Sequence, residues 1–259
     1  MTPTEETYYR RYLNDIPFGG AQVLPIAFNP VVSFSDTFTR ANGDLGINWL
    51  SQMRNNGSGT SDQFPTAVIL NNKLRLSAVG NSNNNISDCI WIPQQLIATD
   101  PNTNLPGGIW GKNQYAQITF QAMSTNGSGV RQGVGIFAKN NTGGGVGEAQ
   151  IYLLAVRYTS SGFGSIDIWK VIGGQNESGG TTTILGTSGA VPNAGDILRV
   201  EGTYSGTTIT LVYKKNGTQI LSVTDNPANS QIGWPCIMVF TSLGSTVSGD
   251  WTNFSCGMI

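Results

Sequence analysis

From about residue 33 to the C-terminus, apolar and polar residues alternate in short runs rich in Val, Ile, Thr and Tyr, and clusters of Gly, Asn and Ser separate these runs. A period of two places successive side chains on opposite faces of a strand, so the pattern predicts antiparallel β-strands. We expect strands at residues 32–38, 67–70, 73–79, 88–92, 114–123, 130–139, 148–158, 165–172, 181–185, 196–204, 207–214, 219–224, 236–241 and 250–254. So many strands with almost no helix signal predict an all-β chain folded as a two-sheet sandwich or a barrel.

Three pairs of predicted strands are separated by turn residues only. Asn71-Asn72, Ser205-Gly206 and Asn216-Gly217 stand between them. These residue types tolerate the positive φ angles of two-residue hairpin loops. We therefore predict three β-hairpins and assign these Asn and Gly residues to turns.

The first 32 residues follow another pattern. Thr4 is a suitable N-cap for a short helix, whereas Pro17, Pro25 and Pro30 interrupt the apolar stretch that follows and favour an extended arm. The arm either packs on its own sandwich or docks on a neighbouring subunit or larger particle, and the sequence favours neither. The expected organisation is an attachment arm at 1–32, with a short helix or extended chain, and one β-domain at 33–259. The apolar and aromatic candidates for assembly in the arm are Tyr8, Tyr9, Tyr12, Leu13, Phe18 and Phe28.

The composition excludes several classes of function. The chain has no His and a net charge of −1, and only 11% of its residues are charged. Without His there is no Ser-His-Asp triad, Cys-His pair or His-ligated zinc. Without a basic surplus we expect no nucleic-acid partner, and without a long apolar run we expect no membrane span. The N-terminus has no hydrophobic signal-peptide core, so we expect a chain that stays in the cell or leaves it by lysis or assembly.

The three cysteines match no metal or redox motif. Buried free thiols are the expected state, and a bridge between Cys236 and Cys256 remains open. The aspartates that could donate oxygens to calcium are Asp36, Asp62, Asp88 and Asp250. No EF-hand or Asp-rich repeat is present. We therefore predict no metal site and no cofactor.

Alternation along the longer strands indicates a candidate ligand surface. If the strands at 114–123, 130–139, 148–158 and 165–172 are neighbours, one outward face carries planar polar groups beside aromatic rings, which suit sugar hydroxyls and sugar rings. A solvated face without a ligand is the simpler alternative. The glycan-binding candidates are Gln117, Gln121, Arg131, Tyr152, Asp167 and Trp169.

Hydrolysis of a glycosidic bond needs two carboxylates placed across it, and no strand offers such a pair. We therefore expect no enzyme and no catalytic residue. Two further tryptophans, Trp110 and Trp234, fall in predicted loops, where an exposed ring suits a partner contact.

Four segments carry a resemblance to a known family. Residues 34–49 read FSDTFTRANGDLGINW, residues 69–76 read ILNNKLRL, residues 233–237 read GWPCI and residues 249–254 read GDWTNF. Together they resemble the concanavalin A-like lectin/glucanase jelly-roll superfamily over residues 33–256, in a form found in tailed-bacteriophage virion proteins and bacterial surface proteins. The resemblance implies a two-sheet antiparallel jelly roll and carries over no catalytic residue, because the paired-Glu motif of the glucanases is missing.

The resemblance and the arm together predict a non-enzymatic protein of a phage virion surface. Such a protein, a capsid cement or decoration protein or a tail-associated adhesin, is assembled in the host cytoplasm. Its expected partners are the major capsid or tail protein, further copies of itself with a trimer favoured, and a host-surface glycan. The alternatives are a glycan-binding lectin module of a bacterial surface protein and, with less support, a glycoside hydrolase.

Overall fold

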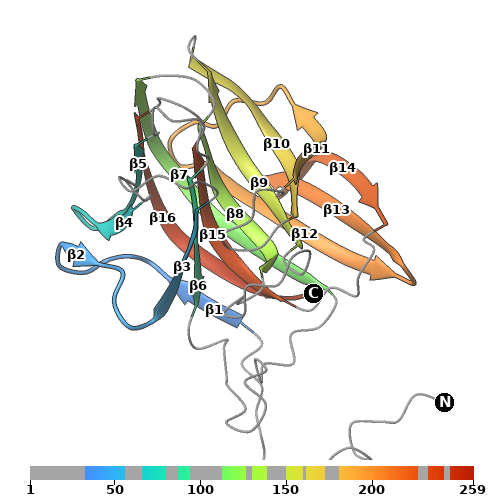
Figure 1. The fold of residues 1–259 in the computed structure, drawn as a ribbon, viewed down its shortest axis with the longest axis horizontal. Coiled ribbons are helices and arrows are strands. Elements are labelled where there is room, and N and C mark those ends of the chain that lie inside the picture. The colour runs from blue at the N-terminus through green and yellow to red at the C-terminus, as the bar shows by residue number, and fades with distance from the viewer. Residues whose placement is uncertain are drawn as a thin grey trace, which may run out of the picture. The chain divides into compact units, whose positions relative to one another are not determined.

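The structure, a computed structural model, describes residues 33–55, 66–79, 87–93, 113–126, 130–138, 150–159, 162–172, 181–226, 233–241 and 246–259. Figure 1 shows these residues as β-strands joined by turns and loops. The strands are β1 (Ser33–Asp36), β2 (Gly43–Asp44), β3 (Trp49–Asn55), β4 (Thr66–Ile69), β5 (Leu74–Val79), β6 (Ser87–Pro93), β7 (Gln114–Asn126), β8 (Val130–Ala138), β9 (Gln150–Thr159), β10 (Gly162–Ile172), β11 (Thr181–Ser188), β12 (Ile197–Ser205), β13 (Thr208–Lys215), β14 (Thr218–Asp225), β15 (Trp234–Thr241) and β16 (Thr246–Met258).

The strands form two antiparallel sheets. Sheet A has the order β14-β13-β12-β7-β16-β5-β4-β2, with β1 also paired to β16, and sheet B has the order β11-β10-β9-β8-β15-β6-β3. This architecture confirms the predicted all-β, two-sheet jelly-roll sandwich. The prediction missed β2 and β3, because the Gly- and Asn-rich segment around them reads as loop.

The three predicted hairpins are confirmed. The β4–β5, β12–β13 and β13–β14 pairs are antiparallel, and short turns join them. Asn71 and Asn216 adopt positive φ angles of 53°, and Gly206 and Gly217 adopt 62° and 81°. The Asn and Gly turn residues therefore have the left-handed conformation that such turns require. Ser205 is instead the last residue of β12 and pairs with Thr208, so the turn of this hairpin lies one residue later than predicted, at Gly206 and Thr207.

The core lies between the sheets and follows the period-two pattern. In β7, Ala116, Ile118 and Phe120 are buried, and in β10 the fully buried Ile166 and Ile168 occupy alternate positions. Burying these apolar faces against each other contributes about 25 cal/mol for each Å² removed from water. The two facing layers of apolar side chains thus hold the sandwich together.

Two buried glutamines cross this apolar layer in opposite directions. From sheet B, Gln132 donates through Nε2 to the carbonyl of Leu76 at 3.2 Å and accepts through Oε1 from the indole of Trp251 at 3.1 Å, both in sheet A. From sheet A, Gln114 donates through Nε2 to the carbonyl of Gly233 at 2.7 Å, next to β15 of sheet B. Each amide joins polar atoms that would be costly to bury alone.

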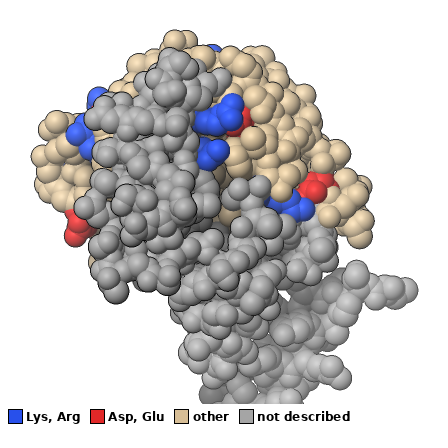
Figure 2. All heavy atoms as spheres, turned by 45° about the horizontal axis from the view of Figure 1, so that its top comes forward, with Lys and Arg blue, Asp and Glu red and all other residues tan. Residues whose placement is uncertain are grey.

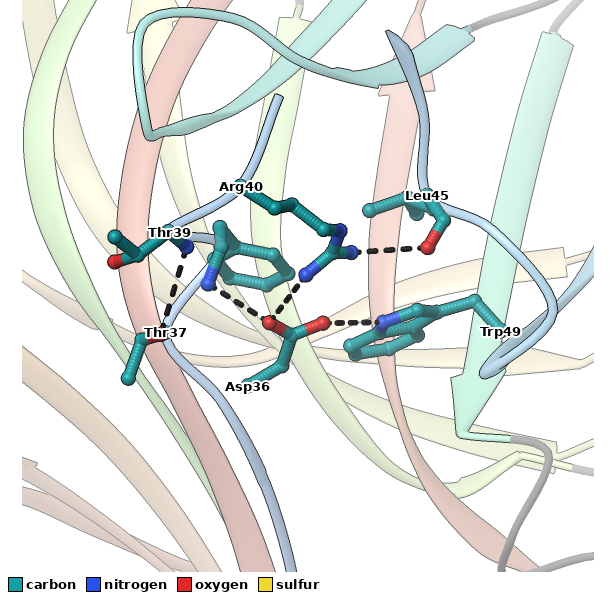
Figure 3. A network of polar contacts seen from close by, with 7 residues as sticks. Asp36, Thr37, Thr39, Arg40, Leu45 and Trp49 are labelled. Atoms are coloured by element: carbon teal, nitrogen blue, oxygen red, sulfur yellow. Dashed lines mark hydrogen bonds and ion pairs between the residues drawn. The ribbon is translucent and has the colours of Figure 1, made fainter. Parts of the chain in front are cut away.

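The segment at residues 36–49, which carries part of the family resemblance, has a structural role. Figure 3 shows the Asp36 carboxylate between the Arg40 guanidinium and the Trp49 indole. Its Oδ1 accepts hydrogen bonds of 2.7 Å from Nη1 of Arg40 and from the backbone N–H of Phe38, and its Oδ2 accepts one of 2.8 Å from Nε1 of Trp49. Arg40 also donates to the Leu45 carbonyl at 2.9 Å. The motif therefore folds the β1–β3 connection around one carboxylate.

The described cysteines are thiols. Cys236 and Cys256 are free and buried, and burial raises the pKa of Cys256. The bridge left open by the sequence is therefore absent from this structure.

The predicted attachment arm, with Tyr8, Tyr9, Tyr12, Leu13, Phe18 and Phe28, lies outside the described residues, as does Trp110. No part of the chain that the structure describes forms a helix of the length and hydropathy that membrane crossing requires.

The Asp36 contacts predict a pH-dependent contribution to stability. Burial alone would raise the pKa of Asp36, but hydrogen bonds from Arg40, Trp49 and Phe38 outweigh burial and hold this pKa below the ordinary aspartate value of 3.8. The stabilisation is therefore fully present above pH 3.8 and is lost as the pH falls through the lower folded pKa.

We expect Asp36→Asn to lower the free energy of unfolding at pH 7 by about 1–3 kcal/mol in urea titrations, and this loss of stability to become smaller in acid. Asp44→Asn, at an exposed carboxylate of β2, is the matched control and should change little. An equal effect of both variants would contradict the role of Asp36.

Gly249 predicts a second stability effect. A Cβ atom at this position would overlap Oε1 of Gln132 and lie 2.8 Å from Nε1 of Trp251. We expect Gly249→Ala to separate these two groups and lower the free energy of unfolding by about 1–3 kcal/mol. The control is Gly189→Ala, where an added Cβ meets nothing within 4 Å. Unchanged urea midpoints for both variants would show that the Gln132 contact contributes little.

Candidate functional site: the outer face of sheet B

The outer face of sheet B carries the side chains that alternate with core residues along β8 and β10. Gln132 reaches sheet A, so Arg131 beside it faces away, and Ser165, Asp167 and Trp169 alternate with the buried Ile166 and Ile168. Strand pairing brings these residues together: Arg131 lies opposite Arg157, and Arg157 lies opposite Ser165. We call Arg131, Arg157, Ser165, Asp167 and Trp169 the sheet B polar cluster.

Asp167 is the centre of the cluster. Its Oδ1 accepts a hydrogen bond of 2.8 Å from the Ser165 hydroxyl, and its Oδ2 accepts one of 3.3 Å from Nε1 of Trp169. The Nε of Arg157 lies 3.4 Å from Oδ2 of Asp167 and donates to Oγ of Ser165 at 3.1 Å. Both carboxylate oxygens are thus engaged within the cluster, which fixes the positions of the hydroxyl, the indole and one guanidinium.

Arg131 covers the ring of Trp169. Its Cζ lies 3.9 Å from the ring centroid, a cation–π contact. Burial and, second to it, the charge of Arg157 lower the pKa of Arg131, and Asp167 opposes both effects, so that the net pKa is about 10. Because the guanidinium occupies this face of the ring, a ligand would meet Arg131 before it met this face of the indole.

Three residues of the cluster are buried, and Arg157 is more accessible. Ser165, Asp167 and Trp169 are 3%, 0% and 5% exposed, whereas the Arg157 side chain is 33% exposed. Polar groups this deep are held in place by their partners, unlike side chains on a freely solvated sheet face. This arrangement offers N–H groups that donate hydrogen bonds from a fixed position and in a fixed direction.

The structure separates the six glycan-binding candidates of the sequence. Arg131, Asp167 and Trp169 lie together in the cluster. Gln117 and Gln121 lie on β7 of sheet A, where Gln117 accepts from Arg199 and Gln121 donates to Thr252. The assumption that the strand at 114–123 neighbours the other three was wrong, because β7 pairs with β12 and β16.

Tyr152 and Trp234 also require correction. Tyr152 is buried between the sheets, and its hydroxyl donates to Oδ2 of Asp225 in sheet A at 2.7 Å, where Lys170 also pairs. The sequence analysis placed Tyr152 on the outward face of its strand, whereas in the structure this residue of β9 faces sheet A. Trp234 is 2% exposed and begins β15, so its ring belongs to the core and not to an exposed loop.

Sequence reasoning missed Arg157 and Ser165. Ser165 could have been found, because it lies two residues before Asp167 on the same strand and so shares its face. Arg157 could not, since its place beside Ser165 depends on the β9–β10 register, which shifts between Phe163 and Ser165.

Charged residues are sparse on the surface. Figure 2 shows a face on which most described residues are uncharged. Within the described residues, no group of three His, Cys, Asp or Glu side chains could hold a metal ion. Asp36 and Asp250, two potential calcium ligands, are instead paired with Arg40 and Arg75.

Comparisons with known proteins identify the fold but no family. No family model matches the chain, and no curated protein matches it. Among solved structures, a LamA variant from Z. galactanivorans in complex with laminaritriose and laminaritetraose is 8% identical, with a TM-score of 0.53, over 89% of this chain and 100% of that one. The alginate lyase Aly36B is 16% identical, with a TM-score of 0.42, over 74% and 83%. The CBM2 module of Lactobacillus casei BL23 phage J-1 evolved Dit is 12% identical, with a TM-score of 0.46, over 87% and 96%.

These comparisons correct one expectation and leave another without support. The expectation of a chain that is no enzyme is contradicted, because LamA, an enzyme, shares the fold at a TM-score of 0.53. The virion-surface prediction gains no support, since the phage module has a TM-score below 0.5. The virion location, the capsid or tail partners and the trimer remain predictions. At these identities the likeness shows the fold alone, and the fold is that of the concanavalin A-like jelly rolls.

Proposed function

We propose that this chain binds carbohydrate through the outer face of sheet B, at the sheet B polar cluster. The observation that carries the proposal is the grouping of two guanidinium groups, a hydroxyl and an indole around the buried carboxylate of Asp167. The jelly-roll fold, which carbohydrate-active proteins also have, supports it.

The chemistry of the cluster suits sugar recognition. Sugar hydroxyls need donors and acceptors at fixed angles, and the Ser165–Asp167–Trp169 contacts fix the base of the cluster. Arg157 and Arg131 are the parts that a ligand would contact. A positioned donor loses little conformational freedom when it binds, so more of the hydrogen-bond energy contributes to affinity.

A matched pair of arginines tests the proposal. Arg131 lies over Trp169 in sheet B, and Arg199 lies over Tyr115 in sheet A, with its Cζ 3.7 Å from the ring centroid. The two contacts are alike, but only the first belongs to the cluster. We expect the wild type to bind at least one polysaccharide in affinity electrophoresis, Arg131→Ala to weaken this binding about ten-fold or more, and Arg199→Ala to leave it unchanged.

Thermal unfolding of both variants provides the folding control. Equal losses of binding in the two variants, or no binding of any polysaccharide by the wild type, would refute the proposal. Each mixture is also assayed for new reducing ends and for absorbance from unsaturated sugar ends. A product in either assay would show that the bound chain is also cleaved.

A further inference from the structure

The two arginines of the cluster stand directly opposite each other. In the β8–β9 ladder Arg131 pairs with Arg157, and both side chains lie on the outer face of sheet B. Like charges at directly opposed positions of antiparallel strands repel and destabilise the pair. The repulsion is felt here, because the charge of Arg157 lowers the pKa of Arg131.

Asp167 offsets this repulsion only in part. It lies beside Arg157, and its attraction for Arg131 ranks below the repulsion from Arg157. Its two oxygens are already engaged by Ser165, Trp169 and Arg157. A sugar hydroxyl would therefore find Asp167 occupied, whereas an anionic group would reduce the repulsion between the two guanidinium groups.

Arg157 has donors left for such a group. Its contacts with the described residues are made through Nε, so its two Nη groups make no hydrogen bond to any residue in the described ranges. The side chain is 33% exposed, so these N–H groups can be reached from solvent. The planar fork of a guanidinium matches the paired oxygens of a carboxylate or a sulfate.

We propose that the ligand of the sheet B polar cluster is an anionic sugar, whose carboxylate or sulfate binds the Nη groups of Arg157 and lies between Arg157 and Arg131. This inference rests on the proposed carbohydrate binding and specifies its substrate class as acidic polysaccharides. Arg157 is the anion-binding residue, and Asp167 and Ser165 position it through its Nε.

The test compares three soluble oligosaccharides by titration calorimetry against the full chain. Oligogalacturonate carries carboxylates, a carrageenan oligomer carries sulfates, and a laminarin oligomer is neutral. We expect one or both anionic oligomers to bind at least ten-fold more tightly than the neutral one, and the better of the two identifies the source of the charge. The anionic binding should weaken as salt rises, because salt screens the attraction.

Variants assign this binding to the cluster. Arg157→Lys keeps the charge but loses the fork, and we expect about a ten-fold loss of affinity for the anionic oligomer. Arg199→Lys is the matched control on sheet A and should bind as the wild type does. A third measurement needs no variant: free galacturonate should displace the bound oligomer, whereas galactose, which lacks the carboxylate, should not.

The outcomes separate this inference from the proposed function. If the neutral oligomer binds as well as the anionic ones and Arg131→Ala abolishes its binding, carbohydrate binding stands and the anionic specificity is overturned. If no oligomer binds, the anionic specificity is overturned, and carbohydrate binding falls with it only if the wild type also binds no polysaccharide in affinity electrophoresis. If Arg157→Lys and Arg199→Lys lose affinity equally, the attraction is general surface electrostatics, and the assignment to this cluster is overturned.

Discussion

The structure depends on burying one face of each sheet against the other without leaving a polar atom unsatisfied inside. Apolar burial alone would allow the sheets to slide or rotate, since dispersion and hydrophobic forces have little directionality. The buried amides of Gln132 and Gln114 are directional, and each reaches from one sheet to the other. The space for Gln132 exists because residue 249 has no side chain. A specific register between the layers follows from these contacts.

The candidate site lies on the face of sheet B that points away from the core between the sheets. The alternate positions of β8, β9 and β10 lie there, and those of β9 include the buried apolar Leu153 and Ala155. On sheet B they carry a carboxylate that is 0% exposed and an almost fully buried indole, next to two arginines on adjacent strands. Such groups are expensive to bury, so their mutual hydrogen bonds are the reason that they tolerate this position. The same bonds hold Arg157 in one orientation.

The residues that resemble a known family and the residues that form the candidate site are different sets. Asp36, Arg40 and Trp49 close the connection between the first strands, and all three are engaged with one another. The resemblance therefore predicts the fold through a structural network and does not reach the outer face of sheet B. In this chain the network that closes the first strands and the residues of the candidate site are therefore separate, in line with the general finding that functional sites vary on a common fold.

The sequence by itself determined the all-β class, most of the strands and the three hairpins, because period-two alternation and turn residues act over a few neighbouring positions. It also placed Asp167 and Trp169 on one face, since both lie on one strand. Only the tertiary structure decided that β7 belongs to the other sheet, that Tyr152 faces the core and that Arg157 stands between Arg131 and Ser165. Strand order and register join residues far apart in the chain, and a shift of one residue moves a side chain to the opposite face. Local patterns therefore define the strands, whereas long-range pairing assembles the site.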